Sequence, residues 1–297
     1  MARRRADEFP SEVLALFDSW IHGGLSRREF LDRAARHAVG AVGAAAMLAA
    51  LTPDYALAAE IAKDDPRIAA AYESYDVFAS GDTIRGYLAH PSPGTGPWPG
   101  IVVVHENRGL NPYIEDVVRR LAVAGYVAFA PDALTPLGGY PGNEDEAMRR
   151  FAALDPLKRT ADLLAAVSFL RSRAECNGRV GAVGFCYGGG IAALMAVHFP
   201  DLAAAVSFYG IQPSAADTAK IKAPLLIHYA GQDERVDHGW PAWKKALDAS
   251  QVRYRVYTYA GVHHGFHNDT TPRYDAAAAK LAWSRTLGFF AEYLSAR

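Results

Sequence analysis

Residues 179–190 constrain the fold more strongly than any other stretch of the sequence. Residues 180–185 form a short apolar run with β-branched side chains, bounded by glycine, which favours a buried strand over a helix. Three glycines then lead into the apolar residues 191–197, which favour a buried helix. Cys186 stands between these two segments in the sequence Gly-Phe-Cys-Tyr-Gly. The stretch therefore predicts a strand, a tight turn and a helix, with Cys186 at the tip of the turn.

The glycines around Cys186 are what a reactive side chain at the tip of a tight turn requires. Gly184 and Gly188 lack a Cβ, so the backbone can approach closely on both sides. The start of the following helix directs free N–H groups and the positive end of the helix dipole at the cysteine. This field favours a thiolate and, later, an oxyanion. We interpret the turn as a nucleophile elbow of the G-x-S-x-G type with cysteine in place of serine; a buried structural cysteine is the alternative.

The composition is that of a globular protein with one large α/β domain. The chain has 297 residues, of which 51% are hydrophobic and 21% are charged, and this is enough for a full core. The formal net charge of −1 gives no reason to expect a nucleic-acid partner. The basic residues 3–5 are interpreted as a targeting or solvated end. No apolar stretch reaches the roughly 18 residues that span a bilayer, so we expect no stable membrane span.

The two cysteines, Cys176 and Cys186, are not expected to form a disulfide with each other. A strand between them would separate the thiols by about 20 Å, at about 3.3 Å per residue. A disulfide needs Cα atoms within about 7 Å. Cys186 is therefore expected to be available for chemistry.

Residues 1–59 are predicted to lie outside the catalytic domain. Residues 26–31, Ser-Arg-Arg-Glu-Phe-Leu, match the core of a twin-arginine export signal. An alanine-rich run at residues 38–51 and an A-x-A processing site at residues 56–58 follow in the expected order, which predicts export to the periplasm. The alternative is an amphipathic helical arm that is retained in a cytoplasmic protein. Its apolar face would consist of Phe17, Trp20 and Ile21.

In the predicted catalytic domain, residues 60–297, apolar runs alternate with helical patterns. The expected strands are residues 75–78, 84–89, 101–104, 126–130, 180–185, 203–208, 225–229 and 253–259. The expected helices are residues 114–124, 144–154, 159–171, 188–197, 240–250 and 276–294. Such alternation predicts a mostly parallel, eight-stranded sheet with helices on both faces and ligands at the carboxyl ends of the strands. Residues 133–156 are irregular and are expected to form a cap or an active-site loop.

Three reactive side chains directly follow predicted strands and so converge on one edge of the sheet: Cys186, Asp233 and His264. Their order along the chain is that of nucleophile, acid and base in the catalytic triad of α/β hydrolases. Cys186 is expected to attack an acyl carbon as a thiolate, and His264 is expected to take and return the proton. Asp233 is expected to bind the other imidazole nitrogen and to fix its tautomer.

Neighbouring residues offer alternatives to two members of this triad. His263 is an alternative base to His264, and Glu234 or Asp237 is an alternative acid to Asp233. A metal site is a further alternative, built from the clustered side chains His263, His264, His267 and Asp269. Because a metal site would leave the elbow unexplained, we expect no metal and no cofactor.

With these residues in place, the chain resembles the dienelactone hydrolase (carboxymethylenebutenolidase) family over residues 75–294. The motifs that carry the resemblance are residues 103–109 (Val-Val-His-Glu-Asn-Arg-Gly), 125–127, 130–132, 181–190, 231–233 and 264–266. Cysteine at the elbow is the most discriminating of these, since most α/β hydrolases carry serine there. The resemblance implies the α/β-hydrolase fold and the hydrolysis of small esters or lactones through a cysteinyl acyl-enzyme, without a cofactor.

The resemblance also implies roles for residues around the nucleophile. Glu106 matches the glutamate that lies near the thiol and takes part in its substrate-triggered activation. An ion pair between Glu106 and Arg108 is the alternative. The backbone N–H groups of Asn107 and Tyr187 match the oxyanion hole.

The substrate pocket departs from the family pattern. Members that act on dienelactones hold the substrate carboxylate with arginines, one of them a few residues after the catalytic histidine, where this chain has Asn268. Arg108 and Arg273 are the remaining candidates for substrate binding. The expected protein is therefore a monomeric or weakly dimeric hydrolase whose small-molecule ester or lactone the sequence does not specify. An exported binding protein that keeps the fold without catalysis is the alternative.

Overall fold

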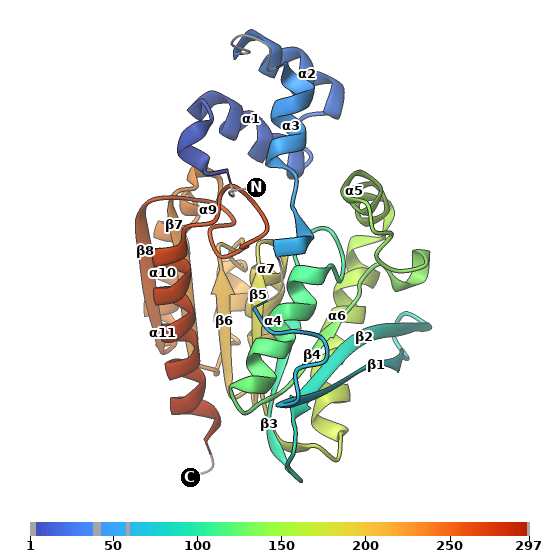
Figure 1. Ribbon diagram of the computed structural model, residues 1–297. Coiled ribbons are helices and arrows are strands. Elements are labelled where there is room, and N and C mark those ends of the chain that lie inside the picture. Colours follow the sequence, from blue (N-terminus) through green and yellow to red (C-terminus); the bar gives the residue numbers. More distant parts are fainter. Residues whose placement is uncertain (1–3, 38–42, 58–59, 296–297) are drawn as a thin grey trace.

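One sheet of eight strands runs through the molecule (Figure 1). The computed structural model describes residues 4–37, 43–57 and 60–295. β1 is antiparallel to β2, and β2 is antiparallel to β4, whereas all other neighbouring strands are parallel. The predicted mostly parallel sheet is thus confirmed. In their order across the sheet, the strands are β1 (Ile68–Val77), β2 (Asp82–Pro91), β4 (Val127–Pro131), β3 (Trp98–Val104), β5 (Cys176–Phe185), β6 (Ala204–Phe208), β7 (Leu225–Gln232) and β8 (Tyr254–His263).

Helices cover both faces of the sheet, which explains why the central strands are apolar on both sides. Helices α6, α7 and α10 share one buried core with the sheet, and α4 and α11 share the core on the opposite face. The helices from α4 onward are α4 (Pro112–Val123), α5 (Glu144–Ala153), α6 (Pro156–Ser172), α7 (Tyr187–His198), α8 (Ala215–Thr218), α9 (Glu234–Asp237), α10 (Trp240–Ala249) and α11 (Ala276–Leu294).

Several elements begin earlier than the sequence patterns indicate. Helix α6 starts at Pro156 because the Asp155 side chain accepts a hydrogen bond from the Lys158 N–H and proline suits the first helical position. Strands β1 and β2 are each ten residues long, since their antiparallel register continues beyond the short apolar runs at their centre. Helix α11 has the bounds that the sequence predicts.

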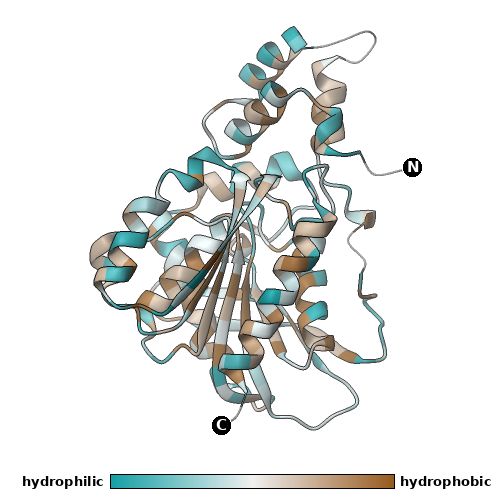
Figure 2. Cartoon of the chain, turned by 90° about the vertical axis from the view of Figure 1, so that its left-hand side faces the viewer, coloured by the Kyte–Doolittle hydropathy of each residue, from teal (hydrophilic) through white to brown (hydrophobic). Residues whose placement is uncertain are grey.

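Residues 4–37, called the N-terminal arm below, lie beyond the carboxyl ends of the parallel strands (Figures 1 and 2). The arm contains α1 (Ser11–Ile21) and α2 (Arg27–Ala34), and it packs with α3 (Ala44–Leu51). The three helices enclose a small apolar core of their own, which includes Phe17, Trp20, Ile21, Phe30 and Leu51. The face formed by Phe17, Trp20 and Ile21 is therefore buried, as the retained-arm alternative requires.

The export signal falls partly on residues that the structure does not describe. Residues 38–42 of the alanine-rich run and Ala58 of the A-x-A site lie outside the described residues. Export to the periplasm stays a prediction. Among the residues described, no helix combines the length and the apolar character needed to cross a membrane.

Candidate active site

Cys186 lies at the sharp turn between β5 and α7, with a φ of 55° that non-glycine residues rarely adopt. A Cβ on Gly184 would lie 1.8 Å from the carbonyl oxygen of Gly188. A Cβ on Gly188 would lie 2.2 Å from the carbonyl oxygen of Val104. Both glycines are thus required by close backbone approach, and the predicted strand, turn and helix are confirmed. Both cysteines are free.

His264 and Asp233 meet in the loops that follow two adjacent strands, β8 and β7. The register pairs His263 with Gln232, so the residue after each strand lies beside its counterpart. The distance between His264 Nδ1 and Asp233 Oδ2 is 2.5 Å. His264 Nε2 is buried and has no hydrogen-bond partner among the described residues. The structure thus pairs His264 with Asp233, and not with the alternative acids Glu234 or Asp237.

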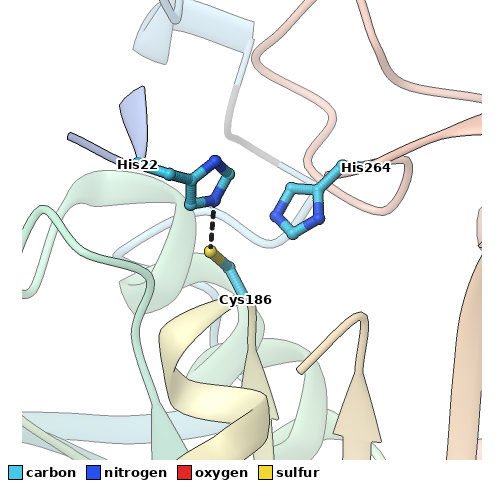
Figure 3. A group of neighbouring side chains, drawn as sticks. All are labelled: His22, Cys186 and His264. Atoms are coloured by element: carbon cyan, nitrogen blue, oxygen red, sulfur yellow. Dashed lines mark hydrogen bonds between the residues drawn. The ribbon is translucent and has the colours of Figure 1, made fainter. Parts of the chain in front are cut away.

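A second histidine, His22, contacts the sulfur from the N-terminal arm (Figure 3). Its Nε2 lies 3.3 Å from Cys186 Sγ, and its Nδ1 lies 2.8 Å from the carbonyl oxygen of Asp18. The rings of His22 and His264 meet edge to face, with centroids 4.8 Å apart. Residues 1–59 were predicted to lie outside the catalytic domain, so a contact between His22 and the sulfur was not expected. His22 and Cys186 are 164 residues apart, and no local pattern connects them.

The charges around Cys186 favour an ionised thiol. Burial alone would raise the pKa of Cys186, but the nearby His264 and His22 lower it well below its usual value. Burial alone would lower the pKa of His264, but the Cys186 sulfur and Asp233 raise it to about 10. A thiolate beside an imidazolium is therefore the favoured resting state at neutral pH.

This electrostatic arrangement predicts how Cys186 reacts with iodoacetamide, an electrophile that alkylates thiolates and not protonated thiols. Because a lowered pKa keeps the thiolate populated where an ordinary thiol is protonated, the alkylation rate should rise much less between about pH 6 and pH 9 than the tenfold per pH unit of an ordinary thiol. Cys176, whose pKa burial raises, should stay unlabelled. Peptide mass spectrometry of the native protein measures both rates. A Cys186 rate that climbs about tenfold per pH unit over this range would contradict the expectation.

The residues expected to form the oxyanion hole lie on either side of Cys186. Tyr187 is the first residue of α7, so its N–H has no acceptor within the helix. Asn107 follows β3, the neighbour of β5 in the sheet. Its side chain donates to the carbonyl oxygen of Ile21 at 2.6 Å and accepts from Arg108 at 2.6 Å. Asn107 is thereby held between the N-terminal arm and Arg108.

Glu106 lies near the sulfur but is not paired with Arg108. Its carboxylate accepts a hydrogen bond from Asn268 Nδ2 at 2.9 Å. Burial and the charge of Cys186 raise its pKa. Arg108 instead lies 3.1 Å from Glu144 of α5, and Arg273 lies 3.5 Å from Asp18 of α1. Both arginines proposed to bind substrate thus face carboxylates of the protein.

A cavity of about 780 Å³ opens beside Cys186 between the N-terminal arm, α5 and the elbow. Its apolar lining includes Trp20, Leu25, Met148, Phe151 and Ile211. Helix α5 lies within residues 133–156, so this irregular segment borders the site. Each arginine of the lining lies within 4 Å of a carboxylate, in the pairs Arg27–Asp145, Arg149–Glu146 and Arg235–Asp18.

Two of the residues named as a possible metal cluster, His267 and Asp269, are engaged elsewhere. His267 Nδ1 lies 2.7 Å from the hydroxyl of Tyr113, and Asp269 is ion-paired with Arg120. Within the described ranges, the ligand atoms that do come together, all within 4.8 Å, belong to His22, Cys186 and His264. The guanidinium of Arg235 lies 3.0 Å from His22 Nε2 and opposes a cation there.

A cysteine on a strand–turn–helix elbow, followed by aspartate and histidine after later strands of a mostly parallel sheet, defines an α/β hydrolase. The model of the dienelactone hydrolase family matches residues 84–294. A putative carboxymethylenebutenolidase of Escherichia coli K12 is 33% identical, covering 77% of this chain and 89% of its own length. The chain therefore belongs to the dienelactone hydrolase family, whose members hydrolyse ester or lactone bonds.

Three further matches cover parts of the chain. The putative hydrolase fragment YghX of Escherichia coli K12 is 50% identical over 38% of this chain and 97% of its own length. The crystal structure of a putative dienelactone hydrolase from Klebsiella pneumoniae superposes with a TM-score of 0.67 at 28% identity, covering 76% of this chain and all of its own. A separate family model, described as YqhI-like, matches residues 1–38.

Proposed function

We propose that this hydrolase cleaves small carboxylic esters or lactones through a cysteinyl acyl-enzyme on Cys186. The observation that carries the proposal is the orientation of His264. Its Nδ1 is bound to Asp233, and its buried Nε2, which has no hydrogen-bond partner in the described part of the chain, lies on the side of Cys186 (Figure 3). This arrangement leaves one imidazole nitrogen free to exchange a proton with the reacting groups.

In the first half-reaction, the thiolate attacks the acyl carbon and forms the carbon–sulfur bond. The carbonyl oxygen becomes an oxyanion, which the N–H groups of Asn107 and Tyr187 would stabilise. The carbon–oxygen bond then breaks, and the leaving alkoxide takes the Nε2 proton of His264. The products are an alcohol, a thioester on Cys186 and a neutral His264.

In the second half-reaction, the neutral His264 takes a proton from water as the water oxygen attacks the thioester. The carbon–sulfur bond breaks, its electron pair returns to Cys186, and a carboxylic acid leaves. The site again holds a thiolate and an imidazolium, so protons balance over the cycle. Asp233 holds the ring orientation in both steps.

The pocket favours neutral substrates over carboxylated ones. Arg108 and Arg273 face Glu144 and Asp18, and the lining arginines are also paired, whereas much of the remaining lining is apolar. A substrate carboxylate would have to displace one of these internal partners. We expect kcat/KM on neutral p-nitrophenyl esters to exceed that on matched esters with a terminal carboxylate by at least about tenfold. A preference for the carboxylated series in steady-state assays would contradict this expectation.

Mass spectrometry tests the acyl-enzyme directly. Brief exposure to a p-nitrophenyl ester, followed by acid quenching and peptide mapping, should place the acyl mass on the peptide that contains Cys186. If the ester is hydrolysed and no cysteine adduct is found, even during the rapid first release of p-nitrophenol, the result would count against covalent catalysis. An adduct on another residue would reassign the nucleophile.

A further inference from the structure

The N-terminal arm contacts the site at three points, each on a group that the proposed reaction uses or that surrounds it. His22 contacts the sulfur of Cys186. The carbonyl oxygen of Ile21 binds the side chain of Asn107. Asp18 forms ion pairs with Arg235 and Arg273, at 3.6 and 3.5 Å. The N-terminal arm therefore lines the site.

The hydrogen bonds of His22 determine which of its nitrogens shares a proton with the sulfur. Its Nδ1 faces the carbonyl oxygen of Asp18, which can only accept, so Nδ1 carries a proton. Nε2 is then the nitrogen that titrates, and it is the one that lies 3.3 Å from Cys186 Sγ. The guanidinium of Arg235 lies 3.0 Å from the same nitrogen and can only donate, so it competes with a proton on Nε2. A bare Nε2 facing a thiolate would place two lone pairs against each other, so a thiolate on Cys186 requires the proton on Nε2, with Arg235 held by its ion pair with Asp18 instead.

We propose that His22 is a catalytic residue of this hydrolase, supplied by the N-terminal arm to hold Cys186 as a thiolate. The proposal rests on the proposed function. In the resting site, Nε2–H donates to the thiolate. When the carbon–sulfur bond forms, the sulfur loses its charge and the hydrogen bond weakens; when that bond breaks, the returning electron pair is again stabilised by Nε2–H. His22 neither gains nor loses a proton over the cycle.

With two histidines, one imidazole can stabilise the thiolate while the other transfers the proton. In a site with one histidine, the imidazolium that stabilises the thiolate must also give its proton to the leaving group. Here His264 transfers the proton, while His22 keeps its own proton and stabilises the negative charge on the sulfur whenever that charge is present. Burial alone would lower the pKa of His22, but the charge of Cys186 and the bonds to Asp18 and Cys186 raise it, which agrees with this role.

The charged groups around the sulfur come from several elements, so the effect of His22 must be separated from theirs. Besides His22 and His264, they are Asp18 on α1, Glu106 after β3, Asp233 after β7, Arg235 on α9, and Arg273 after β8. Glu106 is bound by Asn268, and Arg235 is partly exposed. Of these groups, His22 is the one on the arm that lies within hydrogen-bond distance of the sulfur, so a single substitution on the arm changes this contact.

His22→Gln tests the proposal, with His198→Gln as the matched control. His198 is an exposed histidine at the far end of α7. In the full-length protein, His22→Gln should raise the pKa of Cys186, so that its alkylation by iodoacetamide at about pH 6 becomes slower by about tenfold. The p-nitrophenyl ester assay should show slower deacylation by about tenfold, with a larger fraction of acyl-enzyme at steady state. His198→Gln should match the parent in both measurements.

Several results would overturn the role of His22. One is an alkylation profile and a deacylation rate within twofold of the control. Another is faster turnover in His22→Gln, which would mean that the arm occludes the thiol. A third is stoichiometric zinc in the purified protein with chelator-sensitive activity, which would make the histidines metal ligands. Failure of the proposed function differs from all three, because Cys186→Ala would then retain turnover in the same assay.

Discussion

Replacing Cys186 with alanine is expected to lower kcat on a p-nitrophenyl ester by at least about 10⁴-fold. The thiolate is the group that forms the carbon–sulfur bond, and an alanine side chain offers no nucleophile in its place. The fold should survive, because the side chain is small and the strained turn is set by Gly184 and Gly188. Steady-state kinetics and thermal unfolding of the same preparation measure both effects.

The control for this variant is Cys176→Ala. Cys176 is the first residue of β5, is also buried, and lies at the opposite end of the strand from the elbow. It should keep turnover within about twofold of the parent, although it loses some packing at its site. Near-normal hydrolysis by Cys186→Ala, or loss of activity in Cys176→Ala with the fold intact, would contradict the assignment of Cys186 as the nucleophile.

Gly184→Ala is expected to destabilise the protein by more than about 3 kcal/mol. The added Cβ would overlap backbone atoms, which a side-chain rotation cannot move away. The added atom would lie 1.8 Å from the Gly188 carbonyl oxygen and 2.2 Å from its carbon. Relief requires a shift at the start of α7, which would also move Cys186. Urea unfolding and the yield of soluble protein measure the loss of stability.

Gly288→Ala is the matched control for the same substitution. Gly288 lies inside α11, and a Cβ built there meets no atom within 4 Å. Alanine in a helix interior is more stable than glycine by about 0.5–1 kcal/mol, so this variant should gain stability and keep activity. If both variants unfolded at the urea concentration of the parent, close backbone approach would not be what requires glycine at the elbow.

The fold was predictable because its signals are local. The apolar run of residues 180–185, the glycines and the following apolar helix define β5 and α7 without knowledge of any other part of the chain. Strand ends were harder to predict. Residues 68–74 of β1 are mostly small or exposed, so their pairing with β2 depends on a partner strand and not on their own pattern.

The part of the site that local sequence signals mark was predictable, and the part that depends on tertiary contacts was not. Cys186, Asp233 and His264 each follow a strand, and parallel strands bring such positions to one edge. His22 has no such marker, because it follows the end of α1 in a segment whose arginine pair indicated export. The partners of Arg108 and Glu106 also depended on tertiary contacts, with Glu144 and Asn268 lying far from them in sequence.

Residues 26–31, which the sequence predicts to be the core of a twin-arginine signal, lie in the docked arm. Phe30 is fully buried in the core of the arm, and Arg27 lies 3.3 Å from Asp145 at the rim of the pocket. Export machinery that reads this motif requires the segment to be accessible. With the arm in place, Phe30 of this motif is buried, whereas the side chains of Arg27 and Arg28 stay 55% and 92% exposed. If the predicted export requires Phe30 to be accessible as well, the arm would have to unfold first, and His22 would then be absent from the site during translocation.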